Sequence, residues 1–277
     1  MVHDSTIVPA ESRIAVIAGR GDYPILCSRN IAAVGHEPVV IAVDDGVNAE
    51  WLASFSEGRA VKISVGQMAK FLRVLKNFGV KFAVMAGQVK PKKLFRGMIP
   101  DAKALLMLAA LKEYNAESIF GAIANEIAKI GVQLLDARWF MEDELATVGP
   151  MTCKRSKISE ENLKFGVRVA REVANLNIGQ SVVVRRGTVI AVEDFAGTDE
   201  LIARVGKFNL RDAIFVKTAK HSQDFRFDVP VFGMQTLEKL AAANIKYAAL
   251  EAESVIILHK KDVLAFARER AIEIVGF

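Results

Sequence analysis

The feature that most constrains the fold is a regular alternation of apolar runs and amphipathic segments over residues 13–86, with a similar pattern continuing to residue 135. Strands buried on both faces of a sheet are near-continuous apolar runs, and the helices between them carry apolar residues at helical intervals. The sequence therefore predicts a parallel sheet covered on both faces, as in a Rossmann-like domain. The predicted strands are 13–18, 38–43, 60–64, 81–86 and 131–135, and the predicted helices are 23–34, 48–56, 67–78, 101–114 and 117–130.

A break in this pattern divides the chain. Gly149-Pro150 cannot continue a helix, and a basic run ending at Lys157 follows it, so residues 147–158 are predicted to form a linker. At 277 residues the chain is long enough for two hydrophobic cores. We therefore expect a Rossmann-like N-terminal domain over residues 1–146 and a second domain over residues 159–277.

The second domain does not repeat the regular strand–helix alternation of the first, and its pattern indicates a mixed sheet. A helix is predicted from an N-cap at Ser159 to about Leu176, and two apolar runs on either side of Arg-Arg-Gly187 predict a hairpin. The fold class is thus α/β, with a parallel-sheet N-terminal domain and a mixed-sheet α/β C-terminal domain that carries the chemistry. Further helices are expected at 199–208 and 234–243, with a strand at 213–216 between them.

Charge and composition limit the kinds of partner that the chain is expected to bind. The net charge of +5 favours anionic partners such as phosphorylated metabolites or acidic lipid surfaces. Nucleic acid is not expected, because the chain has no arginine-rich arm or basic stripe among aromatic residues. The two cysteines form no Cys-x-x-Cys pair, which fits a reducing cytoplasm. No signal peptide or membrane-spanning run is visible, so we expect a soluble cytoplasmic protein with peripheral membrane association left open.

A segment rich in charged side chains, residues 217–230, follows the strand predicted at 213–216 and is the most informative about chemistry. Its lysines and arginine suit a phosphate-bearing substrate, because they make charge-assisted hydrogen bonds to phosphate oxygens. Its aspartates would supply a metal ligand or a group that orients water. The alternative is a solvated loop with self-neutralising charges. The residues concerned are Lys217, Lys220, Asp224, Arg226 and Asp228.

Two glycine-containing loops close predicted strands of the N-terminal domain. Gly19 and Gly21, with Asp22, lead into a helix, where glycine permits close approach of a phosphate and the helix N-terminus offers amides. Pro24 stands where a dinucleotide fingerprint needs a small residue, so the alternative is a structural turn. Asp44 ends the second strand, where a ribose-binding acid would lie. The loop with Gly87, Gln88 and Lys90 repeats the arrangement, and its alternative is a basic surface loop.

Polar residues also gather at the open end of the predicted hairpin. Because a hairpin folds back, Gln180 or Ser181 should approach Glu193. Thr198 and Asp199 begin the next helix, where a cap is the default explanation. Together with residues 217–228, these side chains would assemble a binding site at several strand ends. The sequence shows no zinc-type His or Cys pair, P-loop or nucleophile elbow.

Several motifs follow one another along the chain. They are Ile17-Ala-Gly-Arg-Gly21 with Pro24, Met85-Ala-Gly-Gln-Val89, Leu176-Asn-Ile-Gly-Gln-Ser181, Ala191-Val-Glu193, Gly197-Thr-Asp199 and Lys220-His-Ser-Gln-Asp-Phe-Arg-Phe-Asp-Val-Pro230. In this order they resemble the LpxI-type UDP-2,3-diacylglucosamine pyrophosphatases of lipid A biosynthesis, over nearly the whole chain from about residue 13. Departures are His221-Ser222, where the family usually has Lys-Pro followed by a variable residue, and Phe232, which replaces the common Ile.

The resemblance implies hydrolysis of UDP-2,3-diacylglucosamine to UMP and 2,3-diacylglucosamine 1-phosphate (lipid X), with Mg²⁺, by a site between the two domains. Asp228 occupies the position of the family's essential acid, and we expect it to bind Mg²⁺ or to orient water. Asp224 would assist, and Arg226 and Lys217 would bind phosphoryl oxygens. The expected substrate-binding residues are Gly19, Gly21, Asp22, Gly87, Gln88, Lys90, Gln180, Ser181, Glu193, Thr198, Asp199, Lys217, Lys220 and Gln223.

A lipid-bearing substrate also requires an apolar trough. The run Leu105–Leu111 and the pair Met98-Ile99 are candidates, although apolar helices usually pack inside and the core interpretation is favoured. The positive charge suits docking on an anionic inner membrane. A homodimer is left open. The alternative functions are a nucleotide-binding oxidoreductase and a non-catalytic module that binds a nucleotide sugar.

Overall fold

The computed structural model describes residues 8–64, 66–89 and 100–277. Within these residues the chain forms two compact units. The first comprises residues up to Met141 together with Phe225–Asp228, and the second comprises Glu142–Asp224 and Val229–Phe277. The second unit thus begins at Glu142, five residues before the predicted linker, and the segment Phe225–Asp228 returns to the first unit.

The first unit is built on a parallel sheet whose strand order is β3-β2-β1-β4-β5. This is a doubly wound order, which reverses between β1 and β4, where such sheets bind ligands. The predicted parallel sheet is therefore confirmed. Its strands are β1 (Arg13–Ala18), β2 (Glu37–Ala42), β3 (Ala60–Lys62), β4 (Phe82–Ala86) and β5 (Gln133–Leu134). Its helices are α1 (Tyr23–Ala33), α2 (Ala49–Ala53), α3 (Met68–Asn77), α5 (Ala102–Ala109) and α6 (Ala116–Lys129).

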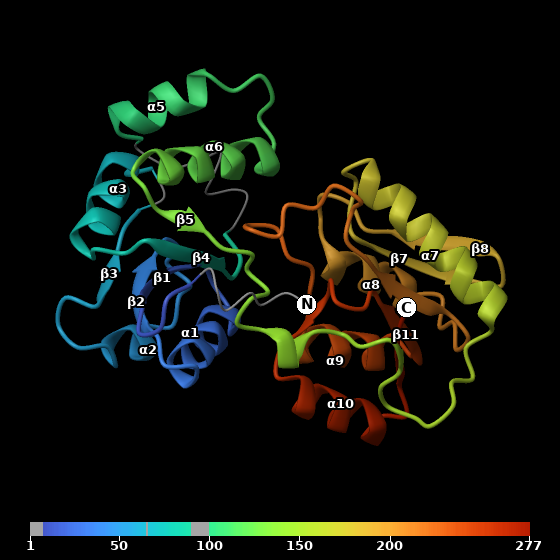
Figure 1. Cartoon of the computed structure of the whole chain (residues 1–277). Coiled ribbons are helices and arrows are strands. Elements are labelled where there is room, and N and C mark those ends of the chain that lie inside the picture. The colour runs from blue at the N-terminus through green and yellow to red at the C-terminus, as the bar shows by residue number, and fades with distance from the viewer. Residues whose placement is uncertain (1–7, 65, 90–99) are drawn as a thin grey trace. The chain divides into compact units, whose positions relative to one another are not determined.

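Helices cover both faces of this sheet (Figure 1). One core lies between the sheet and the pair α3 and α6, with Phe71, Leu75 and Ile127 buried in it. On the opposite face, α1 buries Cys27 and Ile31. Burial from both sides explains why the strands are apolar throughout instead of alternating with polar residues.

Helix α5 is partly exposed, contrary to the favoured interpretation of its apolar run as a helix packed in the core. Only Ala104 of this helix is fully buried, while Leu105 is 54% and Leu106 is 74% exposed. Met107 still packs against the core. Apart from Lys103 every residue of the helix is apolar, so one side packs and the other leaves an apolar stripe at its surface. The pair Met98-Ile99 lies outside the described residues.

The second unit has a mixed sheet in the order β6-β13-β11-β9-β7-β8, and a short sheet of β10 and β12. The predicted mixed α/β class is confirmed. Its strands are β6 (Gly149–Pro150), β7 (Ser181–Arg185), β8 (Thr188–Val192), β9 (Ile214–Lys217), β10 (Val231–Phe232), β11 (Tyr247–Leu250), β12 (Ile256–Ile257) and β13 (Glu273–Gly276). Its helices are η1 (Glu142–Glu144), α7 (Glu160–Asn175), α8 (Thr198–Gly206), α9 (Met234–Ala242) and α10 (Lys260–Glu269).

The predicted hairpin is the pair β7 and β8, joined at Arg186 and Gly187. Both turn residues have positive φ, 47° and 72° respectively, as a two-residue turn of this kind requires. The predicted N-cap is also confirmed, since the Ser159 side chain accepts a hydrogen bond from the Asn162 amide. Helix α7 packs on β7 and β9, whereas α8, α9 and α10 belong to the core on the other face (Figure 1).

Candidate active site

The two glycine loops of the first unit are joined directly to each other at the carboxyl ends of β1 and β4. The amide of Gly19 donates to the carbonyl of Ala86 at 2.8 Å. Arg20 and Gln88 exchange backbone hydrogen bonds of 2.8 and 3.1 Å. The amides of Gly19 and Arg20 are therefore engaged within the protein, which the sequence pattern did not indicate.

This close approach accounts for two of the glycines. A Cβ at Gly19 would lie 2.7 Å from the carbonyl oxygen of Gln88, and one at Gly87 would lie 2.7 Å from that of Arg20. Both distances are below any ordinary contact, so each position requires glycine whether or not a ligand binds. Gly21 instead has a φ of 89°, and Asp22 follows at the N-terminus of α1 without a side-chain cap. Roles of these residues in substrate binding stay predictions.

Asp44, expected to bind a ribose, is held by the same loop. Its carboxylate accepts hydrogen bonds from the Arg20 guanidinium at 2.9 Å and from the Gly46 amide at 2.7 Å. The residue is almost fully buried. The ion pair therefore ties the end of β2 to the loop after β1, a structural function that the position of Asp44 alone does not reveal.

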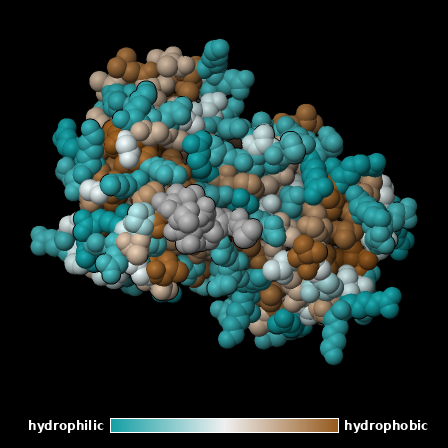
Figure 2. Space-filling model, in the orientation of Figure 1, coloured by the Kyte–Doolittle hydropathy of each residue, from teal (hydrophilic) through white to brown (hydrophobic). Residues whose placement is uncertain are grey.

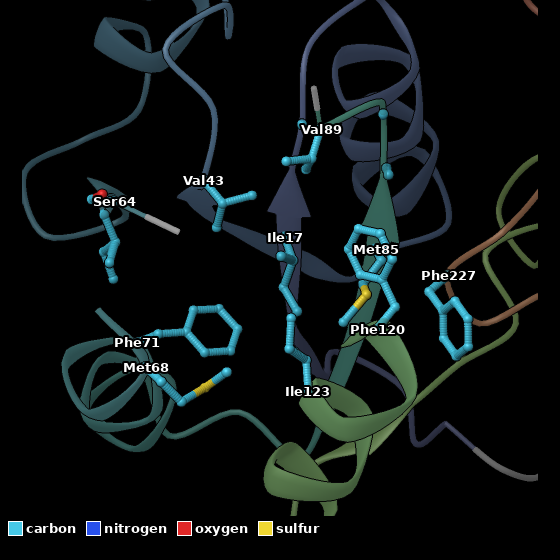
Figure 3. A pocket seen from close by; sticks show the side chains of 14 residues that line it. Ile17, Val43, Ser64, Met68, Phe71, Met85, Val89, Phe120, Ile123 and Phe227 are labelled. Atoms are coloured by element: carbon cyan, nitrogen blue, oxygen red, sulfur yellow. The ribbon is translucent and has the colours of Figure 1, made fainter. Parts of the chain in front are cut away.

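An apolar pocket opens beside these loops within the first unit (Figure 3). Helix α3 contributes Met68 and Phe71, and α6 contributes Phe120 and Ile123. Its cavity volume is about 60 Å³, which suits a slender group. The other lining residues are Ile17, Gly19, Val43, Ile63, Ser64, Met85, Ala86, Gly87, Val89 and Phe227. The predicted trough at Leu105–Leu111 is not part of this lining.

Phe227 reaches the pocket from the charged segment. Its ring stacks on Phe120 with centroids 6.0 Å apart and an interplanar angle of 21°. Phe225 and Phe227 are half-buried, whereas Arg226 and Asp228 are exposed. The carboxylate proposed to be essential therefore follows directly after an aromatic side chain that lines an apolar pocket. Contacts assign Asp224 to the second unit and Asp228 to the first.

In the second unit a polar cluster forms where β7 begins and β9 ends. Ser181 and Lys217 are register partners, and the Lys217 ammonium donates to the Ser181 hydroxyl at 3.2 Å. The same ammonium lies 3.9 Å from Glu193, with side chains only 7% and 14% exposed respectively. The amide of Gln180 donates to the Glu193 carboxylate at 3.3 Å, which confirms the predicted approach across the hairpin.

Glu193 is charged in this cluster. Burial alone would raise the pKa of its carboxyl group, but the Lys217 ammonium and hydrogen bonds from Thr198, Ser181 and the Gln180 amide outweigh it. The pKa of Glu193 is therefore held below its ordinary value. A buried lysine beside a buried carboxylate gives a compact polar group at the end of the sheet, suited to a phosphate oxygen or a hydroxyl of a ligand.

The interpretation of Thr198 as a helix cap is wrong. Helix α8 is preceded by Gly197 as its N-cap residue, without a side-chain cap bond. Instead the Thr198 hydroxyl donates to the Glu193 carboxylate at 2.6 Å. Asp199, the next residue, forms an ion pair with Lys239 of α9. Thr198 thus joins the polar cluster, while Asp199 stabilises the contact of two helices.

The start of the charged segment is anchored by residues that sequence reasoning missed. Glu251, directly after β11, accepts hydrogen bonds from the Thr218 hydroxyl at 2.6 Å and the Ala219 amide at 2.9 Å. Arg171 of α7 pairs with Glu251 at 2.8 Å. Although burial opposes it, these partners lower the pKa of Glu251 below its ordinary value. The available signal was an acid immediately after a parallel strand, much as Lys217 stands at the end of β9.

Further contacts shape the next turn of this segment. The Lys220 ammonium donates to the Asn177 side chain at 3.2 Å, and the Lys220 amide donates to the Gln223 side chain at 3.1 Å. The amide of His221 donates to Asn175 at 2.9 Å. The C-terminal end of α7 therefore holds the loop. Lys90, expected to bind substrate, lies outside the described residues.

Two searches of the described residues bear on metals and membranes. No group of three or more His, Cys, Asp or Glu side chains in these ranges could hold a metal ion. Across residues 8–64, 66–89 and 100–277, no helix has the length and apolarity to cross a bilayer.

Fold and side chains together define a two-unit α/β protein that places polar and apolar binding groups at strand ends of both units. Family models match both units in sequence: the LpxI N-terminal domain over residues 13–144 and the LpxI C-terminal domain over residues 147–275. The chain therefore belongs to the LpxI family. It is 25% identical to the UDP-2,3-diacylglucosamine pyrophosphatase LpxI of Caulobacter vibrioides, over 95% of this chain and 97% of that protein.

Proposed function

We propose that this protein hydrolyses the pyrophosphate bond of UDP-2,3-diacylglucosamine, giving UMP and 2,3-diacylglucosamine 1-phosphate, as a step of lipid A biosynthesis. Membership of the LpxI family and the similarity to the Caulobacter enzyme along almost the full chain support this activity. The structural observation that carries it is the exposed carboxylate of Asp228 directly after Phe227, which lines an apolar pocket. A lipid that bears phosphates needs both features.

The reaction adds water to one phosphorus while the bond from the bridging oxygen to that phosphorus breaks. The substrate pyrophosphate is a stable dianion, so the protein must neutralise charge and hold water in line. In our proposal Asp228 orients the attacking water or holds the metal, with Asp224 assisting. Lys217, Lys220 and Arg226 bind phosphoryl oxygens, because their charges match those oxygens.

We include Mg²⁺ in the proposal, with Asp228 as the residue that would hold it. Magnesium is commonly bound by one or two carboxylates together with substrate phosphates, instead of by a cage made only of protein side chains. A single exposed carboxylate that shares the ion with oxygens of the substrate phosphates fits that donor set. When bound, the ion would neutralise phosphate oxygens and stabilise the leaving phosphate.

The apolar pocket of the first unit is proposed to receive part of an acyl chain. Its lining is almost entirely aliphatic, aromatic or thioether, and it is narrow. An apolar pocket with a few polar groups at its mouth is typical of a ligand site. Ser64 and the two glycines provide the small polar share of this lining.

We further propose that the stripe on α5 contacts the membrane in which such a lipid resides. The exposed residues Ala102, Leu105, Leu106 and Ala109 follow one another at helical spacing along the surface of α5. Figure 2 shows hydrophobic residues gathered over this helix. The exposed Lys112 lies three residues beyond the end of α5, and the net charge of the chain is +5, which together favour an anionic lipid surface.

The decisive experiment incubates purified protein with UDP-2,3-diacylglucosamine in mixed detergent micelles with Mg²⁺ and measures UMP release. We expect turnover by the wild type, its loss on adding EDTA, and a fall of at least ~100-fold in kcat for Asp228→Asn. The matched control is Asp143→Asn, an exposed carboxylate outside the predicted site, which should keep wild-type kcat.

The same assay separates the proposal from its alternatives. A non-catalytic module would bind the substrate without releasing UMP. An oxidoreductase would bind nicotinamide, for which the fingerprint is interrupted at Pro24. Near-normal kcat in Asp228→Asn would contradict the assignment of that residue while leaving the activity itself intact.

A further inference from the structure

The segment Phe225–Asp228 is the part of the charged loop whose contacts lie in the first unit. The side chains of Phe225 and Phe227 are half-buried there, whereas those of Arg226 and Asp228 are exposed. Phe225 and Phe227 therefore anchor the backbone that carries the exposed carboxylate of Asp228. Residues that contact these two anchors help to set where that backbone lies.

Arg138 packs on the ring of the first anchor, Phe225. Its guanidinium lies 3.5 Å from the centroid of the Phe225 ring, a short cation–π distance. Beside it, the amide of Ala137 donates to the carbonyl of Phe225 at 2.8 Å. Ring and backbone of Phe225 are thus both fixed by two consecutive residues.

The guanidinium is itself held in position. The Arg138 side chain donates to both carboxylate oxygens of Asp136, with Nε 3.0 Å from one of them, and the Arg138 amide donates to the same carboxylate at 2.9 Å. The Arg138 side chain is 16% exposed. A planar guanidinium fixed by a carboxylate loses few further degrees of freedom when a ring packs on its face.

The backbone around Arg138 is tied to α1. The buried Tyr23 hydroxyl donates to the Ala137 carbonyl at 2.6 Å, and the Asn30 side chain donates to the Phe140 carbonyl at 2.6 Å. Burial raises the pKa of Tyr23 well above its ordinary value, so this hydroxyl remains a donor throughout the physiological range. Arg138 therefore projects from a rigid platform.

We propose that Arg138 is a positioning residue, which fixes Phe225 and through it the carboxylate of Asp228. This inference rests on the proposed function, since it assigns Asp228 the acting carboxylate. The ion pair between Arg138 and Asp136 is local in sequence and partly exposed, so it contributes little to global stability by itself. Its effect is to aim the guanidinium at the ring of Phe225.

The test is a double-mutant cycle on kcat, with Arg138→Met, Phe225→Leu and both together. Small misplacements of a reacting group cost up to ~100-fold, so we expect each single variant to lower kcat about tenfold with KM changed less than about twofold. Because both changes remove one contact, the double variant should be no slower than either single variant. Arg138→Lys keeps a cation but loses the planar guanidinium that Asp136 holds, so it should recover only part of the rate.

Arg270→Met is the matched control, because Arg270 lies 5.1 Å from the Phe266 ring in α10 and contacts neither the segment nor the proposed site. It should keep wild-type kcat. A purely structural role for Arg138 would lower the melting temperature and leave the kcat of the folded fraction unchanged. That result would overturn the proposal. So would a double variant in which the factor lost in kcat equals the product of the factors lost in the two single variants.

A second measurement is independent of turnover. Amide hydrogen exchange at Ala137, which donates to Phe225, should become about tenfold faster in Arg138→Met, since loosening of the segment opens this hydrogen bond. Unchanged exchange would refute the positioning role even if the protein had no activity on UDP-2,3-diacylglucosamine. A wild type that releases no UMP would refute the proposed function alone.

Discussion

Replacing Lys217 with Met should destabilise the second unit, because it leaves a buried carboxylate without its cation. In the native structure the Lys217 ammonium lies 3.9 Å from Glu193, and both side chains are nearly enclosed. Met preserves most of the volume of the aliphatic stem, so the change isolates the loss of charge. The lost partner is the first favourable contribution to the lowered pKa of Glu193.

The size of the effect follows from opposing contributions. Two unit charges at this separation attract by about 4 kcal/mol at an effective dielectric constant of ~20. Removing the lysine also relieves its own desolvation, and Glu193 keeps hydrogen bonds from Thr198 and the Gln180 amide. Loss of one partner of a buried pair usually costs about 3–5 kcal/mol, so with these bonds retained we expect about 2–3 kcal/mol.

The penalty should depend on pH with a definite sign. The folded-state pKa of Glu193 is below its ordinary value of 4.5, so wild-type stabilisation is present above that value and is lost as pH falls through the folded pKa. In Lys217→Met, burial dominates and raises the pKa of Glu193. The variant should therefore lose most stability near pH 7, and the difference from wild type should shrink as pH falls toward 4.5.

Urea unfolding followed by far-UV circular dichroism measures this penalty. Both tryptophans, Trp51 and Trp139, lie in the first unit, so fluorescence reports that unit separately. Glu193→Gln in the Lys217→Met background should restore stability to within ~1 kcal/mol of wild type, because no buried charge remains. Lys164→Met, which breaks the exposed pair with Glu160, should not shift the transition. A double variant as unstable as Lys217→Met would refute the reasoning.

Two further predictions concern backbone packing and the membrane. Gly179→Ala should destabilise the second unit by about 1–3 kcal/mol, because the new Cβ would lie 2.5 Å from the Glu193 carbonyl oxygen. Thermal melting measures this loss of stability. An unchanged melting temperature would show that the loop shifts and relieves the clash. Replacing Leu105 and Leu106 by Ser should reduce flotation with vesicles containing anionic lipid while leaving UMP release in detergent intact, and equal flotation would exclude this stripe as the contact.

Sequence periodicity predicted the first unit well, because burial on both faces of a parallel sheet leaves a strong apolar signal. The strand predicted at 13–18 is β1, and that predicted at 81–86 is β4 with one residue fewer. Helix α5 marks the limit of this reasoning. Its apolar composition favoured the core, but periodicity cannot distinguish a helix packed on all sides from one packed on only one side, so the exposed Leu106 was not foreseen.

The candidate site was predictable where secondary structure alone sets proximity. A hairpin must bring Gln180 to Glu193, and the register of β7 against β9 brings Ser181 to Lys217. It was not predictable where a side chain has two possible roles. A threonine at the start of a helix usually caps it, and only the structure shows that Thr198 turns to Glu193 instead.

The segment Phe225–Asp228 shows why an essential position can be named from sequence while its setting cannot. Its residues follow a strand of the second unit, and a local pattern assigns them to that unit. Their contacts are nevertheless with Arg138 and Phe120, far away in the chain, because aromatic rings seek an apolar or cationic face wherever the fold provides one. Tertiary contacts of its neighbours therefore help to set the position of Asp228, and mutations in the first unit that break these contacts should change its chemistry without touching it.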